Sequence, residues 1–279
     1  MTLLGAAQIR ELAAKLDLKP SKSLGQNFVI DSNVCTKIVR TAGVTADDIA
    51  LEIGPGLGSL TLAMLEAAKS VIAVEIDPRL AEQLPLTVAE HFAHPENLTV
   101  INKDALAVNN LPVAPTVLVA NLPYNVSVPV LLHLLEKFPT IRTGVIMVQA
   151  EVADRLAAKP NTKEYGIPSV QAAWWADVKN VGTVSRSIFW PAPNVDSKLV
   201  GFKRRATPGD ETLRKEVFTI IDLAFAQRRK MLRAALSSRY GGSAAAEGHL
   251  IAAGIDPTLR GESLDIHGFC KIAQQGLEC

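Results

Sequence analysis

The sequence predicts an α/β protein in which helices cover both faces of a mostly parallel sheet, followed by a small all-helical domain. Short apolar or β-branched runs recur about every 20–30 residues, and helix-like segments stand between them. Strands that are apolar on both faces and alternate with helices indicate a doubly wound parallel sheet. After residue 206 the strand-like runs stop, and apolar residues recur only at helical spacing.

Each element of the sheet follows from its own pattern. The expected parallel strands are residues 49–53, 70–76, 98–102, 116–120 and 144–149. The expected helices between them include residues 59–68, 78–92 and 129–137, each long enough for a crossover. Two later runs, residues 178–184 and 197–202, follow one another without an obvious helix between them. We therefore predict that they complete the sheet as an antiparallel pair.

Three regions are expected along the chain. Residues 1–18 carry an apolar helical stripe and are predicted to form an N-terminal helical arm on a main domain of residues 19–206. A turn-rich linker at residues 206–210 leads into a helical domain of residues 207–279. This domain begins with an amphipathic helix that Asp210 can cap, and two shorter helices are expected at residues 244–253 and 264–275.

Composition excludes several classes of protein. Hydrophobic residues make up 48% and charged residues 20% of the chain, which excludes a disordered tail, a collagen-like repeat and a coiled coil. The chain has no apolar run of membrane-spanning length, and its N-terminus lacks the pattern of a signal peptide. Cys35, Cys270 and Cys279 lack zinc-ligand spacing. We therefore expect a cytoplasmic protein with reduced thiols, no metal site and no membrane partner.

The net charge of +1 hides an uneven distribution. Residues 196–239 contain eleven basic and five acidic residues, a net charge of +6, so the rest of the chain carries −5. A mildly acidic body suits a small-molecule site, and a basic segment suits contact with a polyanion. The alternative is that the basic residues are only solvated side chains on the exposed faces of helices.

A glycine loop follows the first predicted parallel strand. Gly54, Gly56 and Gly58 form a G-x-G-x-G pattern between a strand and a helix, and Ser59 stands where a dinucleotide fingerprint requires glycine. Glycine lets the backbone approach a ligand closely. The pattern therefore favours a ligand without phosphates, although a simple turn explains the loop by itself equally well.

Polar residues follow the next three strands. Glu75 ends the second strand, 17 residues after Gly58, where a carboxylate can accept hydrogen bonds from both ribose hydroxyls. Asp104 follows the third strand and Asn121 the fourth. Since open α/β sheets bind ligands at the carboxyl ends of their strands, these positions predict a nucleoside site.

Several motifs resemble a known family. Residues 54–58 with Glu75 and Asp104 resemble class I S-adenosylmethionine-dependent methyltransferases, and Asn121-Leu122-Pro123-Tyr124 resembles their amino-methylating motif. Residues 23–28, 165–166, 189–197 and 225–230 resemble one branch, the small-subunit ribosomal RNA adenine dimethyltransferases. The resemblance covers residues 19–275. It implies a Rossmann-like methyltransferase sheet in the main domain, with S-adenosyl-L-methionine as cofactor.

The resemblance also implies roles for individual residues. Those expected to bind the cofactor are Asn27, Val29, Gly54, Gly56, Glu75, Asp104 and Asn121. Those expected at the catalytic site are Asn121, Leu122, Pro123, Tyr124 and Phe189. Acceptors on Asn121 and Leu122 would hold the target amine, and Pro123 would fix the turn. Tyr124 and Phe189 would stack on the base, while a core position is an equally good interpretation of Phe189.

Basic residues near the linker are candidates for RNA contact. They are Lys203, Arg204, Arg205, Arg228, Arg229, Lys230 and Arg233. The last four are expected at the start of a helix whose Leu232 and Leu236 face the core. Val29, Ala150 and Asn194 depart from the family pattern, and the last two remove positive charge from the expected RNA face.

The implied function is N6,N6-dimethylation of two adjacent adenosines in a hairpin loop near the 3′ end of small-subunit (16S) rRNA. The implied partner is this RNA in an assembling 30S particle, and we expect a monomeric enzyme. Two alternatives stay open: a large-subunit rRNA adenine N6-methyltransferase of the antibiotic-resistance type, and a non-catalytic RNA-binding assembly factor. Leu122 and the long C-terminal region favour the first function. Ser59 and the motif at Asn121 argue against a dinucleotide oxidoreductase.

Overall fold

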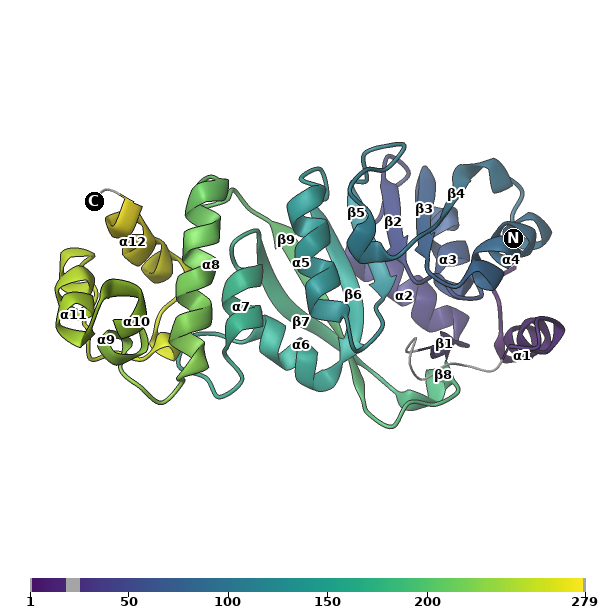
Figure 1. Ribbon diagram of the computed structural model, residues 1–279. Coiled ribbons are helices and arrows are strands. Elements are labelled where there is room, and N and C mark those ends of the chain that lie inside the picture. The colour runs from purple at the N-terminus through teal and green to yellow at the C-terminus, as the bar shows by residue number, and fades with distance from the viewer. Residues whose placement is uncertain (1, 19–25, 278–279) are drawn as a thin grey trace. The chain divides into compact units, whose positions relative to one another are not determined.

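The computed structural model describes residues 2–18 and 26–277 and shows two compact units (Figure 1). The first, here the sheet unit, contains Met1–Ala153 and Lys179–Arg204. The second, here the helical unit, contains Asp154–Val178 and Arg205–Cys279. The second unit therefore includes residues 154–178, a segment without a break in composition at which a boundary could be recognised in the sequence.

The sheet unit is built on seven strands in the order β4-β3-β2-β5-β6-β9-β7. The strands are β2 (Ile49–Ile53), β3 (Ser70–Glu75), β4 (Leu98–Asn102), β5 (Val117–Asn121), β6 (Thr143–Gln149), β7 (Ala176–Val184) and β9 (Ser197–Arg204). β2 to β6 pair in parallel, and β9 pairs antiparallel with β6. This topology confirms the predicted fold class, and every predicted strand overlaps an observed one.

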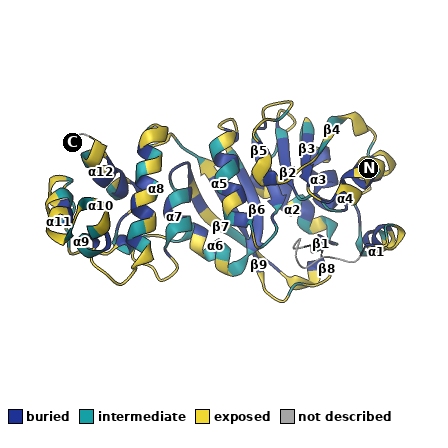
Figure 2. Ribbon diagram, viewed as in Figure 1, coloured by how far each residue is buried: buried dark blue, intermediate teal, exposed yellow. Residues whose placement is uncertain are grey.

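Helices connect the parallel strands and cover the sheet. They are α2 (Ser32–Ala42), α3 (Ser59–Ala67), α4 (Pro78–His91) and α5 (Ser127–Lys137). α2 packs on α3, β5 and β6, and α4 packs on β3 and β4. Figure 2 shows that the central strands are buried while the outer faces of the helices are exposed. Asp31 accepts hydrogen bonds from the first backbone N–H groups of α2, so the helix begins where a cap is available.

The N-terminal helix α1 (Ala6–Lys15) belongs to the sheet unit. Ile9, Leu12 and Ala13 are buried in the same hydrophobic core as residues of β2, β3 and β5. The apolar stripe of the arm therefore packs against the unit.

Two short strands were not expected from the sequence. β1 (Phe28–Val29) pairs antiparallel with β8 (Phe189–Trp190), with Phe28 opposite Trp190 and Val29 opposite Phe189. A two-residue strand is too short to show a period-2 pattern, so only its contacts define it.

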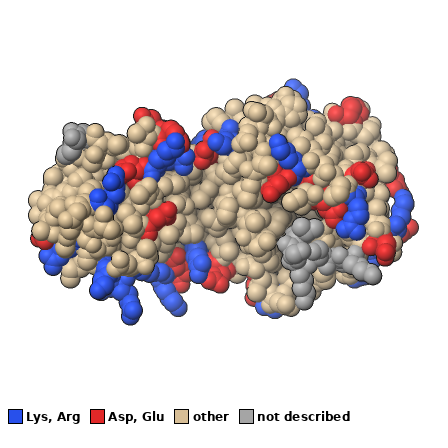
Figure 3. Space-filling model, in the orientation of Figure 1, with Lys and Arg blue, Asp and Glu red and all other residues tan. Residues whose placement is uncertain are grey.

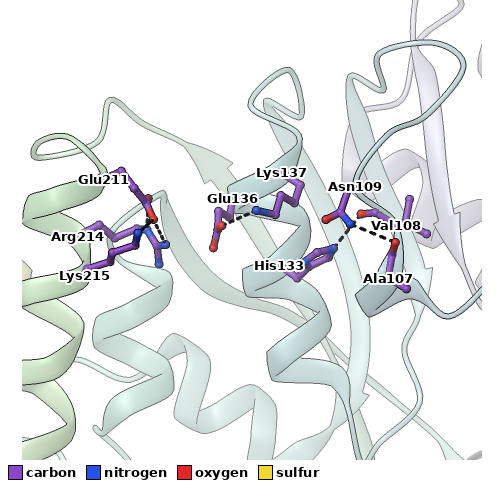
Figure 4. Close-up of polar contacts among 9 residues, drawn as sticks. All are labelled: Ala107, Val108, Asn109, His133, Glu136, Lys137, Glu211, Arg214 and Lys215. Carbon is purple, nitrogen blue, oxygen red and sulfur yellow. Dashed lines mark hydrogen bonds and ion pairs between the residues drawn. The ribbon is translucent and has the colours of Figure 1, made fainter.

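The helical unit is assembled around α8 (Glu211–Ala226). The other helices are α7 (Ile167–Ala172), α9 (Leu232–Ala235), α10 (Ser237–Tyr240), α11 (Ser243–Ala252) and α12 (Ile266–Leu277), and α6 (Ala150–Ala157) ends in this unit. Asp210 caps α8, whose stripe from Leu213 to Ala224 is buried against α12. At the same end, Glu211 pairs with Arg214 at 2.6 Å and Lys215 at 3.6 Å (Figure 4).

The basic cluster in this unit lies in a turn and not at the start of a helix. α8 ends at Ala226 and α9 begins at Leu232, so Arg228, Arg229 and Lys230 lie between the two helices. Leu232 and Leu236 are fully buried, as predicted. Within residues 2–18 and 26–277, none of the helices is long and apolar enough to cross a membrane.

Candidate functional site

The carboxyl ends of β2, β3, β4 and β5 surround a pocket in the sheet unit. The seven residues predicted to bind a cofactor all line it: Asn27, Val29, Gly54, Gly56, Glu75, Asp104 and Asn121. Asn27 and Val29 come from the segment around β1, and the other five come from strand ends. The parallel register places those ends at one edge of the sheet, so residues far apart in the chain meet there. Residues 23–25 of the predicted motif lie outside the described residues.

The glycine loop has a backbone that side chains would disturb. Gly54, Gly56 and Gly58 have φ values of 69°, 59° and 99°. A Cβ on Gly56 would lie 2.9 Å from Cδ1 of Phe28, and a Cβ on Gly58 would lie 2.9 Å from Cδ1 of Leu84. The loop therefore requires glycine both for its left-handed backbone and for its close packing.

Glu75 is held by backbone groups at the mouth of this loop. Its Oε2 accepts a hydrogen bond from the Gly56 N–H at 3.1 Å, and its Oε1 accepts one from the Asp77 N–H at 2.9 Å. Only 5% of the residue is exposed, and burial raises the pKa of its carboxyl above the ordinary value despite these bonds. The two N–H groups fix the carboxylate, and each oxygen keeps a further lone pair for a hydroxyl donor.

Glu52 is a second buried acid that lines the pocket, and it is not among the site residues predicted from the sequence. It is 1% exposed, and its Oε2 accepts a hydrogen bond from the Thr61 hydroxyl at 2.6 Å. Burial, with a smaller effect of Glu75, raises its pKa to about 8. The side chain is therefore mostly protonated at neutral pH. Its position in a strand with an otherwise apolar pattern was the available signal.

Asn121 ends β5 with its amide in the pocket. Its Nδ2 donates a hydrogen bond to the Asn27 carbonyl at 3.1 Å. Because only the nitrogen end of the amide can donate to a carbonyl, this bond also assigns the orientation of the side chain. Oδ1 is then the end available to accept a hydrogen from a ligand. The next residue, Leu122, donates its N–H to the Met147 carbonyl at 3.1 Å, which fixes the start of the turn.

Tyr124 and Phe189 occupy different environments. Tyr124 is half-buried, and its hydroxyl lies 2.7 Å from that of Ser197. Phe189 is 3% exposed and lies in the hydrophobic core, paired with Val29 across the β1–β8 ladder. Phe189 is not among the residues that line the pocket. Its environment is that of the core aromatic residue that the sequence also allowed.

The segment after β4 is tied to α5. Asp104 accepts a hydrogen bond from the Leu106 N–H at 2.9 Å and so begins a short 3-10 helix, η2 (Ala105–Ala107). His133 on α5 donates from Nε2 to the Val108 carbonyl at 2.8 Å, close to the Asn109 side chain (Figure 4). Asp104 therefore lies between β4 and a short helix that packs against α5.

Four of the seven predicted RNA-contact residues direct their guanidinium groups at protein acceptors. Arg204 donates to the carbonyl of Leu135, in the last turn of α5, at 2.7 Å and to that of Ile141, in the loop after α5, at 2.6 Å. Burial lowers its pKa, which fits a structural role. In the helical unit, Arg205 bonds the Ala173 carbonyl and pairs with Asp177. Arg233 pairs with Glu247 at 3.0 Å.

Arg228 joins two loops of the helical unit. Its Nε donates to Glu262 at 2.8 Å, and its Nη2 donates to the Lys163 carbonyl at 2.7 Å. By contrast, the side chains of Arg229 and Lys230 are exposed and have no partner among the described residues, and the same holds for the side chain of Lys203 in the sheet unit. Figure 3 shows Lys and Arg side chains projecting from the surface of the helical unit. Among the predicted contacts, these three are the exposed side chains whose charged groups have no partner within the part of the chain that the structure describes.

Comparison with a family model and with curated proteins identifies one family. The family model for ribosomal RNA adenine dimethylase matches residues 18–275. The chain is 59% identical over 277 residues to a protein named ribosomal RNA small subunit methyltransferase A from Leifsonia xyli, covering 98% of both chains. It is 58% identical to the protein of the same name from Streptomyces avermitilis, covering 98% of this chain and 93% of that protein.

Solved structures agree with this assignment. A dimethyladenosine transferase from Plasmodium falciparum superposes with a TM-score of 0.76 at 25% identity, covering 89% of this chain and 98% of that one. The 23S rRNA methyltransferase ErmE superposes with a TM-score of 0.66 at 28% identity, covering 89% and 99%. Among the described residues, no group of three or more acidic, His or Cys side chains is placed to hold a metal ion. On the family match and the high identity to its relatives, this chain is a member of the ribosomal RNA adenine dimethylase family.

Proposed function

We propose that this protein transfers methyl groups from S-adenosyl-L-methionine to N6 of two adjacent adenosines near the 3′ end of small-subunit (16S) rRNA. The observation that carries the proposal is Asn121, which lines the pocket with its amide oriented by Asn27 and begins the Asn-Leu-Pro-Tyr turn. The reaction belongs to assembly of the small subunit in the cytoplasm, and the enzyme acts as a monomer.

The pocket has the features that this cofactor requires. Glu75 offers fixed carboxylate oxygens to the ribose hydroxyls, and Asp104 lines the same pocket after the end of the neighbouring strand. Gly54 and Gly56 let the loop approach the ligand where side chains would fill the space. Asn27 and Val29 line it from the segment around β1. When bound, the cofactor supplies a methyl group made electrophilic by its sulfonium, so the chain's residues have only to position the amine.

The turn after β5 holds the target amine. Asn121 Oδ1 and the Leu122 carbonyl accept its two hydrogens, which orients the nitrogen lone pair and stabilises the positive charge that develops on the nitrogen. Pro123 fixes the turn, and the ring of Tyr124 stacks on the base, an interaction worth roughly 1–3 kcal/mol. The base has to leave its own stack to reach this position. Phe189, opposite Val29 in the β1–β8 ladder, supports this arrangement from the core.

Exposed basic residues bind the RNA backbone. Lys203 on the sheet unit and Arg229 and Lys230 on the helical unit contact phosphates, because their charges face solvent. Arg204, Arg205, Arg228 and Arg233 position the surrounding backbone through the bonds described above. Binding of this kind is strongly salt-dependent and largely independent of sequence.

The test is methyl transfer from labelled cofactor to small and large ribosomal subunits that lack modifications. We expect label in small subunits only. The likeness to the 23S rRNA methyltransferase ErmE makes the large subunit the informative comparison. Label in large subunits alone would contradict the proposal in favour of the second substrate, and a cofactor-binding protein that labels neither would be a non-catalytic assembly factor.

A further inference from the structure

The hydroxyl of Tyr124 has one described partner, and that partner comes from the antiparallel strand of the sheet. The Tyr124 hydroxyl lies 2.7 Å from the Ser197 hydroxyl, and either oxygen can be the donor. Ser197 is 1% exposed, so its hydroxyl needs a partner inside the protein. Tyr124 supplies it.

The topology explains why these two residues meet. Tyr124 follows β5, whose carboxyl end borders the pocket, and Ser197 is the first residue of β9. β9 runs antiparallel to β6, with Ser197 opposite Gln149, the last residue of β6. The start of β9 therefore lies at the same edge of the sheet as the ends of the parallel strands. An antiparallel strand is the arrangement that brings a strand's first residue to this edge.

The backbone next to Ser197 is itself held in place. The carbonyl of the preceding residue, Asp196, accepts a hydrogen bond from the Ala150 N–H at 2.8 Å, and the Asp196 carboxylate pairs with Arg186 at 2.6 Å. At the other end, the Pro123 carbonyl accepts a hydrogen bond from the Val126 N–H at 3.2 Å, which closes the turn that carries Tyr124. The hydrogen bond thus joins a rigid strand end to the tip of a half-buried ring.

We propose that Ser197 is a positioning residue that holds the ring of Tyr124 in the plane on which the target adenine stacks. The inference rests on the proposed function. A tyrosine ring anchored only at its Cβ can tilt, whereas one also anchored at its hydroxyl keeps its plane. Since transfer requires the amine to approach the methyl group in line, a tilted ring lowers the rate of transfer without changing the cofactor pocket.

The test compares Ser197→Ala, Tyr124→Phe and the double variant. Each single change removes the same hydrogen bond from one end, and Tyr124→Phe keeps the stacking ring. We expect each single variant to lower the single-turnover rate about 3–10-fold, the range that one neutral hydrogen bond supplies. We expect unchanged cofactor affinity by calorimetry, and a double variant no slower than either single one.

Ser169→Ala is the matched control, because it removes another buried serine hydroxyl, which donates to the Arg155 carbonyl in the helical unit. It should lower the melting temperature and leave the rate unchanged. A wild-type rate in Tyr124→Phe would overturn the inference even if Ser197→Ala fails to fold. Where both changes fold, losses that multiply in the double variant would also overturn it. Absence of transfer by the wild type to small subunits would instead overturn the proposed function, and the inference with it.

Discussion

Glu75 is the residue on which the account of the cofactor pocket depends most. We expect Glu75→Gln to weaken binding of S-adenosyl-L-methionine by about 1.5–3 kcal/mol, because it removes charge-assisted hydrogen bonds to the ribose. Isothermal titration calorimetry measures this, with Glu90→Gln on the exposed face of α4 as the control. Equal affinities in the wild type and Glu75→Gln would mean that the carboxylate does not hold the cofactor.

Asn121 is expected to act on the rate more than on binding. Asn121→Ala should leave the fold intact and abolish most transfer, since the amide oxygen interacts most strongly as charge develops on the nitrogen. Single-turnover kinetics at saturating cofactor separate the two effects. A rate within a few-fold of the wild type would remove Asn121 from its role as the amine acceptor.

Burial of Glu52 should make the stability of the protein depend on pH. Its folded-state pKa of about 8 lies above the ordinary value of 4.5, so the folded state favours the protonated carboxyl. Its contribution to stability is complete below pH 4.5 and is lost as the pH rises through 8. Glu52→Gln keeps an acceptor for Thr61 and cannot ionise. Between pH 5 and pH 9 we therefore expect the free energy of unfolding to fall less in the variant than in the wild type. The difference should be on the order of 1 kcal/mol or more.

Denaturation of wild type and Glu52→Gln across that pH range measures the difference. Glu66→Gln, an exposed acid on α3, is the control and should follow the wild type. Parallel pH profiles for wild type and Glu52→Gln would show that Glu52 ionises normally in the folded protein.

At the scale of elements, the turn between α8 and α9 contains basic residues with two different roles: some are expected to bind RNA, and one stabilises the fold. Arg229→Gln with Lys230→Gln should weaken binding of small-subunit RNA and flatten the slope of log affinity against log salt by about 0.7–0.9 for each lost phosphate contact. Cofactor affinity should stay unchanged. Arg228→Gln should instead lower the stability of the helical unit, because its bonds to Glu262 and Lys163 are lost.

Salt titrations of RNA binding and thermal unfolding distinguish the two effects, with Lys271→Gln on α12 as an exposed control. If all three basic residues were only solvated side chains, neither the salt slope nor the melting temperature would change. If Arg228→Gln flattened the slope without lowering stability, Arg228 would be a phosphate contact after all.

Some elements could be predicted and others could not, for physical reasons. β2 and β4 have their predicted bounds because their apolar runs end at loop residues on both sides. The β1–β8 pair depends on contacts between residues about 160 positions apart, and no local period marks it. The turn at Gln227 was missed because Arg, Lys and Gln are all compatible with a helix. Its conformation depends on Arg228 reaching a distant acid.

The candidate site shows the same division. Strand-end residues such as Gly54 and Asp104 could be predicted because parallel strands bring their carboxyl ends together. The bonds that orient them, such as Asn121 to Asn27 and Tyr124 to Ser197, join residues 94 and 73 positions apart. Phenylalanine occurs both in hydrophobic cores and in base-stacking sites. For a residue such as Phe189, only its burial in the folded protein distinguishes the two.

At the scale of the whole molecule, acidic and basic residues serve different functions in different units. The sheet unit holds the pocket, with buried acids at Glu52 and Glu75, while the turn at Arg229 and Lys230 in the helical unit presents charges to solvent. Much of the positive charge of residues 196–239 is paired with acidic side chains of the protein, through Arg205, Arg214, Arg228, Arg233 and Arg239, while Arg204 donates to backbone carbonyls. Net charge over a segment therefore overstates the number of phosphate contacts.

The central claim is that this chain dimethylates adenines of small-subunit RNA. The most direct measurement is mass spectrometry of RNA fragments from unmodified small subunits after incubation with the protein and S-adenosyl-L-methionine. We expect two adjacent N6,N6-dimethyladenosines near the 3′ end of the RNA, and we expect them to be absent with Asn121→Ala. A single methylated adenine in large-subunit RNA, or unmodified small-subunit RNA in the presence of a protein that binds the cofactor, would contradict it.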